Sequence, residues 1–317
     1  MKALVTGATG FVGGQLAHRL AAEGAEVRCL VRTRSRAAKL REAGFELHEG
    51  DALDAAGVRG AGDGVDVAYY LIHSMGRGAS GGEHFGQRDR EAAVNFARMA
   101  REEGVERVVY LGGLGDHTGS PHLRSRHETA TVLAREGPPL TYFRAAMVVG
   151  SESESYRTLR YLVSRLPVMI APAWLRIPTQ PIGVHDVLSY LAAAPRVDEA
   201  AGREVQIGGP DVLTYGEMIG EMADALGKRR PPMVPVPLLT PTLSSLWIGL
   251  VTPVDADVAR PLIEGLGTET VVADPSGARL FDVEPRPFHE VLADAVAHET
   301  RLNGAPTPLD SAARKSS

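Results

Sequence analysis

The chain has 317 residues, of which 44% are hydrophobic and 23% are charged, and its formal net charge is −5. This composition is typical of a globular protein with one large domain or two smaller ones, and the negative charge argues against nucleic-acid or membrane-surface binding. A single cysteine, Cys29, excludes a disulfide framework, and the ten scattered histidines form no set with ligand spacing, so we expect no metal ion. The sequence starts on a glycine-rich turn and not on a basic and then apolar leader, which predicts a cytoplasmic protein.

The first predicted strand, Ala3–Val5, leads into glycines spaced G-x-x-G-x-x-G, and a helix predicted over Val12–Glu23 follows at once. This order is typical of a dinucleotide-binding turn: Gly7 allows the sharp turn, Gly10 lets the backbone approach a pyrophosphate, and Gly13 lets the helix pack on the sheet. The N–H groups and the positive dipole end of the helix attract phosphate. A glycine turn without a ligand is the alternative. The predicted cofactor contacts of the turn are Gly7, Thr9, Gly10, Phe11, Val12 and Gly13.

Apolar runs and helical patterns alternate through the first 150 residues. The strands are predicted at Ala3–Val5, Glu26–Val31, Phe45–Leu47, Val67–Ile72, Arg107–Leu111 and Thr141–Val149. The helices are predicted at Val12–Glu23, Ser35–Ala43, Leu53–Arg59, Glu83–Glu103 and Leu123–Arg135. This alternation predicts an α/β fold, a Rossmann-type doubly wound parallel sheet with helices on both faces. Ligands of such sheets bind at the carboxyl ends of the strands.

The end of the second predicted strand favours NADP over NAD, although NAD stays possible. Six basic side chains and no acidic one lie between residues 28 and 41. Arginine suits the 2′-phosphate of NADP, whereas an acidic residue would bind the ribose hydroxyl of NAD. Arg32 and Arg36 are the candidates, while Lys39 and Arg41 fit a solvated helix face. After the third strand, Asp51 either holds the adenine amine or caps the next helix.

After Gly150 the alternation ends. Helices are predicted at Glu154–Ser164, Asp186–Ala194, Tyr215–Leu226, Thr242–Leu250, Ala256–Leu266 and Phe288–Thr300, and short strands at Pro181–Val184 and Glu204–Ile207. We predict an NAD(P)-binding domain over residues 1–150, a smaller, mainly helical substrate region over 151–302 that partly completes the sheet, and a disordered tail over 303–317.

Three local features of this second half carry further expectations. Thr214, followed by Glu217, predicts a capping box. Asp186 is expected to be a helix N-cap. Met233–Val254 is apolar, but its four prolines exclude a regular membrane-spanning helix. This segment either walls an apolar substrate pocket or packs against the rest of the chain or a dimer partner, so a homodimer is possible.

Three motifs together resemble the short-chain dehydrogenase/reductase superfamily in its extended and atypical branches: residues 6–13, Gly50-Asp51 and residues 104–111. The closer likeness is to the NmrA-like NAD(P)H-binding proteins and to nucleotide-binding accessory subunits of respiratory complex I. The resemblance implies an N-terminal Rossmann domain and a variable C-terminal substrate region. The cofactor contacts that it implies are Gly7, Gly10, Gly13, Arg32 and Asp51, with Leu71, Ile72 and His73 beside the adenosine ribose and the nicotinamide.

The chain departs from this superfamily where the chemistry is done. Typical members have a serine after the fifth strand and a Tyr-x-x-x-Lys pair, but here the strand is followed by Gly112-Gly113, and His122-x-x-x-Arg126 is the best match to the pair. Arg126 would supply positive charge near the nicotinamide ribose, and His122 or His73 would supply the proton, or these histidines are ordinary hydrogen-bonding residues.

Arg144, at the end of the sixth strand, lies either near the nicotinamide or in a buried ion pair. The sequence thus predicts an NADPH-dependent oxidoreductase that acts on a small, apolar organic substrate. One alternative is an NADP(H)-binding protein without turnover, such as a redox sensor, an assembly factor or a subunit of a complex. The last is an epimerase or dehydratase that keeps its cofactor bound.

Overall fold

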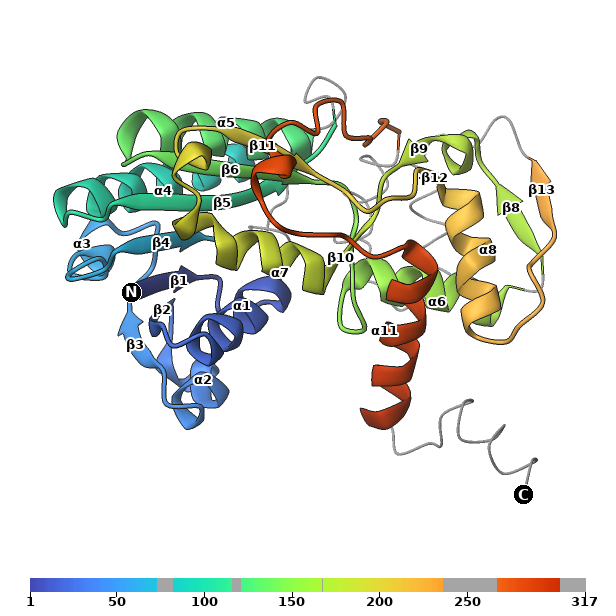
Figure 1. The fold of residues 1–317 in the computed structure, drawn as a ribbon, viewed down its shortest axis with the longest axis horizontal. Helices are drawn as coiled ribbons and strands as arrows, with labels where there is room; N and C mark the ends of the chain where they lie inside the picture. Colours follow the sequence, from blue (N-terminus) through green and yellow to red (C-terminus); the bar gives the residue numbers. More distant parts are fainter. Residues whose placement is uncertain (73–81, 116–120, 167, 236–266, 303–317) are drawn as a thin grey trace. The chain divides into compact units, whose positions relative to one another are not determined.

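The computed structural model describes residues 1–72, 82–115, 121–166, 168–235 and 267–302 (Figure 1). Its contacts divide the chain into two compact units. The first unit consists of Met1–Ala146, His185–Ile207 and Thr268–Glu284, and the second unit contains the remaining segments. Two segments from the second half of the sequence therefore belong to the first unit.

The first unit is built on a seven-stranded sheet in which every neighbouring pair is parallel. Its strands are β1 Lys2–Thr6, β2 Glu26–Val31, β3 Glu46–Glu49, β4 Val67–Tyr70, β5 Arg107–Gly113, β6 Leu140–Ala145 and β11 Glu204–Ile207. The order β11-β6-β5-β4-β1-β2-β3 reverses direction at β1 and β4. This topology confirms the predicted Rossmann-type sheet, and ligands of such sheets bind outside the strand ends where the order reverses.

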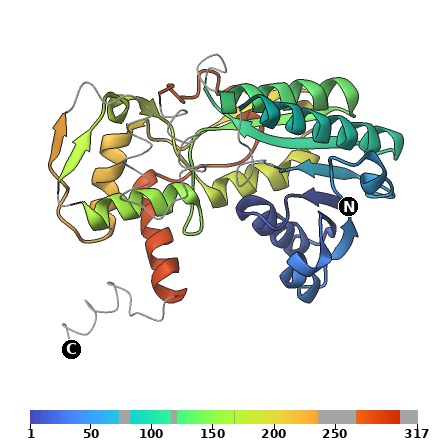
Figure 2. The ribbon, with the colours of Figure 1, turned by 180° about the vertical axis from the view of Figure 1, so that it is seen from behind.

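Helices cover both faces of this sheet. They are α1 Phe11–Ala22, the 3-10 turn η1 Arg34–Ala37 with α2 Ala38–Glu42, α3 Ala55–Val58, α4 Gly82–Glu102, α5 Pro121–Glu136 and α7 Val184–Ala193. Helices α4 and α5 lie on one face, and α1 and α7 lie on the other (Figures 1 and 2). Because both faces are covered, the central strands are almost wholly buried and read as continuous apolar runs.

The main differences between the predicted and the observed elements are the way the strands pair and the residue at which a helix begins. The predicted strand Thr141–Val149 is two strands, since β6 stays in the large sheet while β7, Val148–Val149, pairs with β10, Ile182–Gly183. An apolar run does not show that its two halves have different neighbours. Asp186 is not an N-cap, because α7 begins at Val184 and the aspartate is its third residue.

The second unit packs three helices around a core of its own. They are α6 Glu154–Arg165, α8 Tyr215–Ala225 and α11 Phe288–Leu302, and short strand pairs complete the unit: β10 with β7, β12 Leu213–Thr214 with β9 Pro178–Thr179, and β13 Met233–Pro235 with β8 Met169–Ala171. The predicted capping box is confirmed: Thr214 Oγ1 accepts from the Glu217 amide at 3.2 Å, and the Glu217 carboxylate accepts from the Thr214 amide at 2.7 Å. The helices predicted at 242–250 and 256–266 and the tail 303–317 lie outside the described residues.

Among the helices in the described ranges, none has both the length and the apolar character needed to cross a membrane.

Candidate cofactor site

The glycine turn is held in a conformation that only glycine adopts easily. Gly7 has φ +64°, and a Cβ placed there would lie 2.4 Å from the Leu71 carbonyl oxygen. A Cβ at Gly13 would lie 2.4 Å from the Gly7 carbonyl oxygen. The Gly10 amide donates to the Gly7 carbonyl at 2.8 Å and closes the turn. The helix therefore sits directly on the turn, as the spacing predicts.

The first turn of α1 is open to an anion. Its N-cap is Gly10, no side chain caps it, and its first turn contains no acidic residue. Thr9 and Gly10 are exposed, and Phe11 and Val12 are partly exposed. The amide groups at this end of the helix and its dipole are therefore available to bind a pyrophosphate.

Thr6 joins the glycine turn to the end of the neighbouring strand. Its hydroxyl donates to the Tyr69 carbonyl at 3.1 Å and accepts from the Leu71 amide at 2.9 Å, and the residue is fully buried. These bonds bring the end of β4 against the turn. The sequence contains one sign of this role, a hydroxyl side chain at the end of a buried strand. The contact of Leu71 and Ile72 with the adenosine ribose and the nicotinamide stays a prediction. His73 lies outside the described residues.

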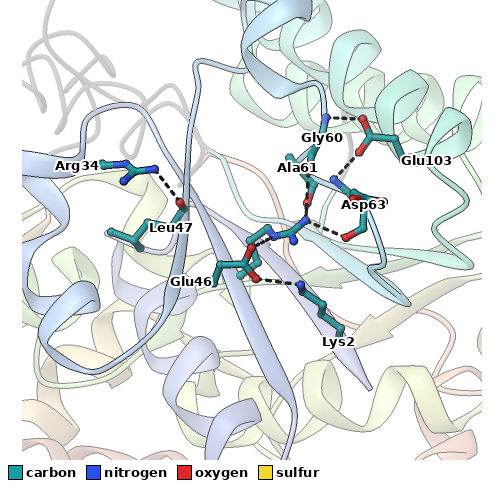
Figure 3. A network of polar contacts seen from close by, with 10 residues as sticks. Lys2, Arg34, Glu46, Leu47, Gly60, Ala61, Asp63 and Glu103 are labelled. Atoms are coloured by element: carbon teal, nitrogen blue, oxygen red, sulfur yellow. Dashed lines mark hydrogen bonds and ion pairs between the residues drawn. The ribbon is translucent and has the colours of Figure 1, made fainter.

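Arg28, one of the six basic residues between positions 28 and 41, is buried and has a structural role. Its Nε donates to Glu46 at 2.8 Å, and its Nη1 donates to three carbonyl groups, those of Gly60, Ala61 and Asp63, at 2.8–3.2 Å (Figure 3). Arg28 therefore fastens the loop after α3 to the sheet. A guanidinium held in this way does not bind a cofactor.

Of the three arginines that follow directly after β2, one is paired and two are open. Arg34 lies 3.4 Å from the Glu49 carboxylate and donates to the Leu47 carbonyl at 3.4 Å (Figure 3). Arg32 and Arg36 are exposed, and in the described part of the chain neither guanidinium has an ion-pair or hydrogen-bond partner. Arg32 directly follows β2, which neighbours the strand that carries the glycine turn.

Asp51 does not cap the helix that follows it. The N-cap of α3 is Asp54, whose carboxylate accepts from the Ala56 amide at 2.9 Å. Asp51 instead accepts from the Leu53 amide at 3.0 Å and remains exposed. The capping alternative is therefore wrong, and contact with adenine stays a prediction.

At the carboxyl end of β5, neighbouring side chains fill the space where the superfamily's serine would lie. A Cβ at Gly112 would lie 2.6 Å from the Tyr142 ring, and one at Gly113 would lie 2.6 Å from Leu123 Cδ2. The Glu269 carbonyl oxygen and the Thr270 side chain pack beside the next glycine, Gly115. These residues are far from Gly115 along the chain, and nothing in the sequence indicates the contact.

Two predicted basic residues lie at the same edge of the sheet. Arg126, on α5, donates to the Leu111 carbonyl at 3.1 Å, and burial lowers the pKa of its guanidinium to about 10, so it remains charged at neutral pH. Arg144 donates to the Gly113 carbonyl at 3.0 Å and to the Gly115 carbonyl, and it pairs with Glu204 at 2.8 Å.

The structure thus shows Arg144 in an ion pair with Glu204, and an ion pair was one of the two predictions for this residue. Its contact with the nicotinamide stays a prediction. His122 belongs to the first turn of α5, but its side chain is outside the described set. Its predicted role as a proton donor, like that of His73, therefore stays a prediction as well.

Comparison with known proteins agrees with this geometry. Residues 7–154, just under half of the chain, match a family model described as NAD(P)H-binding. The chain is 26% identical over 239 residues to a mitochondrial protein of Arabidopsis thaliana, NADH dehydrogenase [ubiquinone] 1 alpha subcomplex subunit 9, covering 71% of this chain and 58% of that one. It is 29% identical over 146 residues to the photosystem II assembly factor Ycf39 of Cyanophora paradoxa, covering 45% and 44%.

A structural likeness extends over nearly the whole chain. The triphenylmethane reductase of Citrobacter sp., solved with NADP(H), superposes with a TM-score of 0.70 at 16% identity, covering 93% of this chain and 100% of that one. At this identity the likeness shows the fold alone. The chain spans about half the length of the two curated relatives. The predicted resemblance is confirmed as a likeness: the N-terminal part of the chain matches an NAD(P)H-binding family model, and a subunit of NADH dehydrogenase is among the relatives.

Proposed function

We propose that the protein is an NADPH-dependent oxidoreductase that transfers hydride between the nicotinamide and a small, apolar organic substrate. The observation that carries the NADPH preference is the pair of open arginines, Arg32 and Arg36, beside the end of β2. Glu49 holds the intervening Arg34. Two unpaired guanidinium groups suit a dianionic 2′-phosphate, since charge-assisted bidentate contacts are among the strongest hydrogen bonds in proteins.

The remainder of the cofactor would follow the sheet edge. The pyrophosphate would lie on the open first turn of α1, and the nicotinamide half would extend past Leu71 and Ile72 toward the end of β5. Arg126 would present its positive charge to the nicotinamide ribose there. The cofactor supplies the hydride, and the protein orients it and excludes water. We propose His73 and His122 as the candidate proton donors. A cytoplasmic location and a small-molecule substrate are part of the same proposal.

A second function is favoured by the filled positions at Gly112 and Gly113. The protein would then bind NADP(H) without turnover and act as a subunit or assembly factor, as the names of two of its curated relatives say of those proteins. An epimerase or dehydratase with a retained cofactor ranks behind both.

The cofactor part of the proposal is tested by a charge-matched pair of double variants. Titration of NADPH into R32Q/R36Q should show an affinity that is lower by about tenfold or more, because each charge-assisted bond contributes roughly 1.5–3 kcal/mol. The control K39Q/R41Q removes the same charge from exposed neighbouring positions and should bind NADPH nearly as the wild type does. Equal losses in both variants would show a general charge effect and contradict a 2′-phosphate site.

Turnover is tested separately, by following the nicotinamide absorbance in the presence of a panel of carbonyl, enone and quinone compounds. Oxidation of NADPH by one acceptor class supports the oxidoreductase, and H73N and H122N should then lower the rate at unchanged NADPH affinity. Tight NADPH binding without turnover across the panel would favour the non-catalytic function.

A further inference from the structure

One peptide group in the loop between β3 and α3 is held by side chains at both of its polar atoms. It is the peptide that joins Ala52 to Leu53. Its carbonyl accepts from Asn95 Nδ2 at 3.0 Å, and its amide donates to Asp51 Oδ1 at 3.0 Å. Because hydrogen bonds are directional, a bond at each end fixes the plane of this peptide and, with it, the position of the Asp51 carboxylate.

Asn95 is a polar residue on an otherwise apolar face of α4. Ala92 and Met99, three residues before it and four after it, lie on the same side of the helix and are buried, as is the adjacent Phe96. An asparagine is less favourable inside a helix than a leucine, and a partly buried amide costs free energy unless it is bonded. Among the described residues, the Ala52 carbonyl is the hydrogen-bond partner of this amide. The bond to the loop therefore explains an asparagine that neither the helix nor the core favours.

The carboxyl ends of β2 and β3 bring Asp51 to the same edge of the sheet as Arg32. Val31, the last residue of β2, is paired in register with Glu49, the last residue of β3. The Gly50 amide donates to the Val31 carbonyl at 2.9 Å, so the two segments stay together past the strands. Arg32 and Asp51 follow directly. Asp51 therefore lies at the end of the site where the adenosine of the proposed cofactor, which carries the 2′-phosphate, would bind.

The Asp51 carboxylate has one oxygen in use and one available. Oδ1 accepts from the Leu53 amide, while in the described ranges Oδ2 has no hydrogen-bond or ion-pair partner, and the residue is exposed. A carboxylate oxygen accepts hydrogen bonds and cannot donate them, so it suits an amino group and is repelled by a carbonyl oxygen. Adenine carries an amino group at the position where hypoxanthine carries a carbonyl oxygen. Asp51 can therefore distinguish the two bases when its carboxylate is held in place.

We propose that Asn95 is a positioning residue for Asp51 and in this way contributes to the recognition of the adenine amino group. Asn95 holds the carbonyl of the 52–53 peptide, the amide of the same peptide holds Oδ1, and Oδ2 is left to accept from the base. This role rests on the proposed function, since it needs a bound dinucleotide, and on the predicted contact of Asp51 with adenine. The buried Ala52 carbonyl needs a donor in any case, so the experiment has to distinguish positioning from a purely structural bond.

The experiment compares the binding of NADPH with that of its deamino analogue, in which hypoxanthine replaces adenine. The wild type should bind NADPH more tightly by about tenfold or more, the worth of one hydrogen bond to a charged group. N95L and N95D remove the donor at nearly unchanged side-chain size, and each should lower the affinity for NADPH until the two ligands bind nearly equally. D51A should show the same loss of preference, and N95L should add nothing to it in a D51A background.

D54A is the matched control, because it loosens the same loop without removing a contact of the 52–53 peptide. Asp54 is the N-cap of α3 and accepts from the Ala56 amide at 2.9 Å. D54A should lower the thermal midpoint and keep the wild-type preference for NADPH. A preference that survives in N95L and N95D, or that D54A loses as well, would make Asn95 a structural residue and contradict the proposal. Equal binding of the two ligands by the wild type would contradict it too.

A second readout does not need the cofactor. Amide hydrogen exchange, followed by NMR, should be faster at Leu53 in N95L than in the wild type, because the bond of this amide to Asp51 opens. Exchange at Ala56, whose amide is bonded to Asp54, should be unchanged. Wild-type exchange at Leu53 in N95L would overturn the positioning role. If the wild type binds neither ligand while Leu53 exchanges faster in N95L, the proposed function fails and the hold of Asn95 on Asp51 stands.

Discussion

At the residue scale, Gly7 combines a left-handed backbone with a contact that excludes any side chain. Both constraints act on G7A, which has to adopt φ +64° and displace the Leu71 backbone. We expect G7A to lower the free energy of unfolding by about 3 kcal/mol or more, or to prevent folding. The matched control is G24A, where φ is +86° but nothing lies within 4 Å of the new Cβ. Denaturant unfolding should give about 1–2 kcal/mol for G24A, and equal losses would contradict the close approach.

Glu221 on α8 is a partly buried titratable group of the second unit. One of its carboxylate oxygens is buried without a hydrogen-bond partner among the described residues. Burial is the largest effect that raises the pKa of Glu221, and the nearby Asp211 and Asp224 raise it further. His289 and Arg230 lower it. The pKa of Glu221 is higher in the folded than in the unfolded protein. Its contribution to the free energy of unfolding is therefore complete at low pH and is lost as the pH rises through the folded pKa.

E221Q should therefore raise the thermal midpoint at neutral pH and flatten its dependence on pH above the ordinary glutamate range. On the same helix, hydrogen bonds from Thr214 lower the pKa of Glu217, so E217Q should lower the midpoint at neutral pH and lose this effect in acid. Thermal melts over a pH series measure both variants. A thermal midpoint of E221Q below that of the wild type at neutral pH would contradict this prediction, because it would show that neighbouring groups stabilise the charge of Glu221.

At the element scale, Arg28 joins β2 to β3 through its ion pair with Glu46, and to the loop after α3 through its hydrogen bonds. Glu46 also binds Lys2 at 2.9 Å, and Glu103 accepts from the amides of Gly60 and Gly62 at 2.6 Å each, so both ends of the loop are held (Figure 3). R28L would leave three carbonyl groups and Glu46 without this partner.

We expect R28L to lower the free energy of unfolding by about 3 kcal/mol or more, because three carbonyl groups lose a donor at roughly 1–3 kcal/mol each, and to leave the ratio of NADPH to NADH affinity unchanged. Denaturant unfolding and cofactor titration check the two parts. A changed ratio with full stability would instead make Arg28 a cofactor residue.

The elements that the sequence predicts well are those whose signal is local. Strand β2 covers the predicted residues, and the capping box at Thr214 forms, because periodicity and cap chemistry act within a few residues. The split between β6 and β7 depends on which strand pairs with Val148, which is a contact with residue 182. The start of α7 two residues before Asp186 was likewise hidden, because an aspartate suits both an N-cap and the first turn.

At the scale of the whole molecule, the geometry of the glycine turn could be predicted from the sequence, whereas the contacts around the end of β5 could not. The glycine turn and the arginines after β2 are contiguous along the chain, so their spacing is visible. Thr6, Tyr142 and Thr270 act through contacts with residues that are distant in sequence. The count of basic residues between positions 28 and 41 also overstated the positive charge, because Arg28 and Arg34 are held by Glu46 and Glu49.

The central claim is that the open turn and the two free arginines form a dinucleotide site that selects the 2′-phosphate. Calorimetric titration of the wild-type protein with NADPH and with NADH tests it most directly. We expect NADPH to bind at least about tenfold more tightly than NADH, and the difference to shrink with added salt. Equal affinity for the two nucleotides would contradict the 2′-phosphate site, and binding of neither would contradict the dinucleotide site itself.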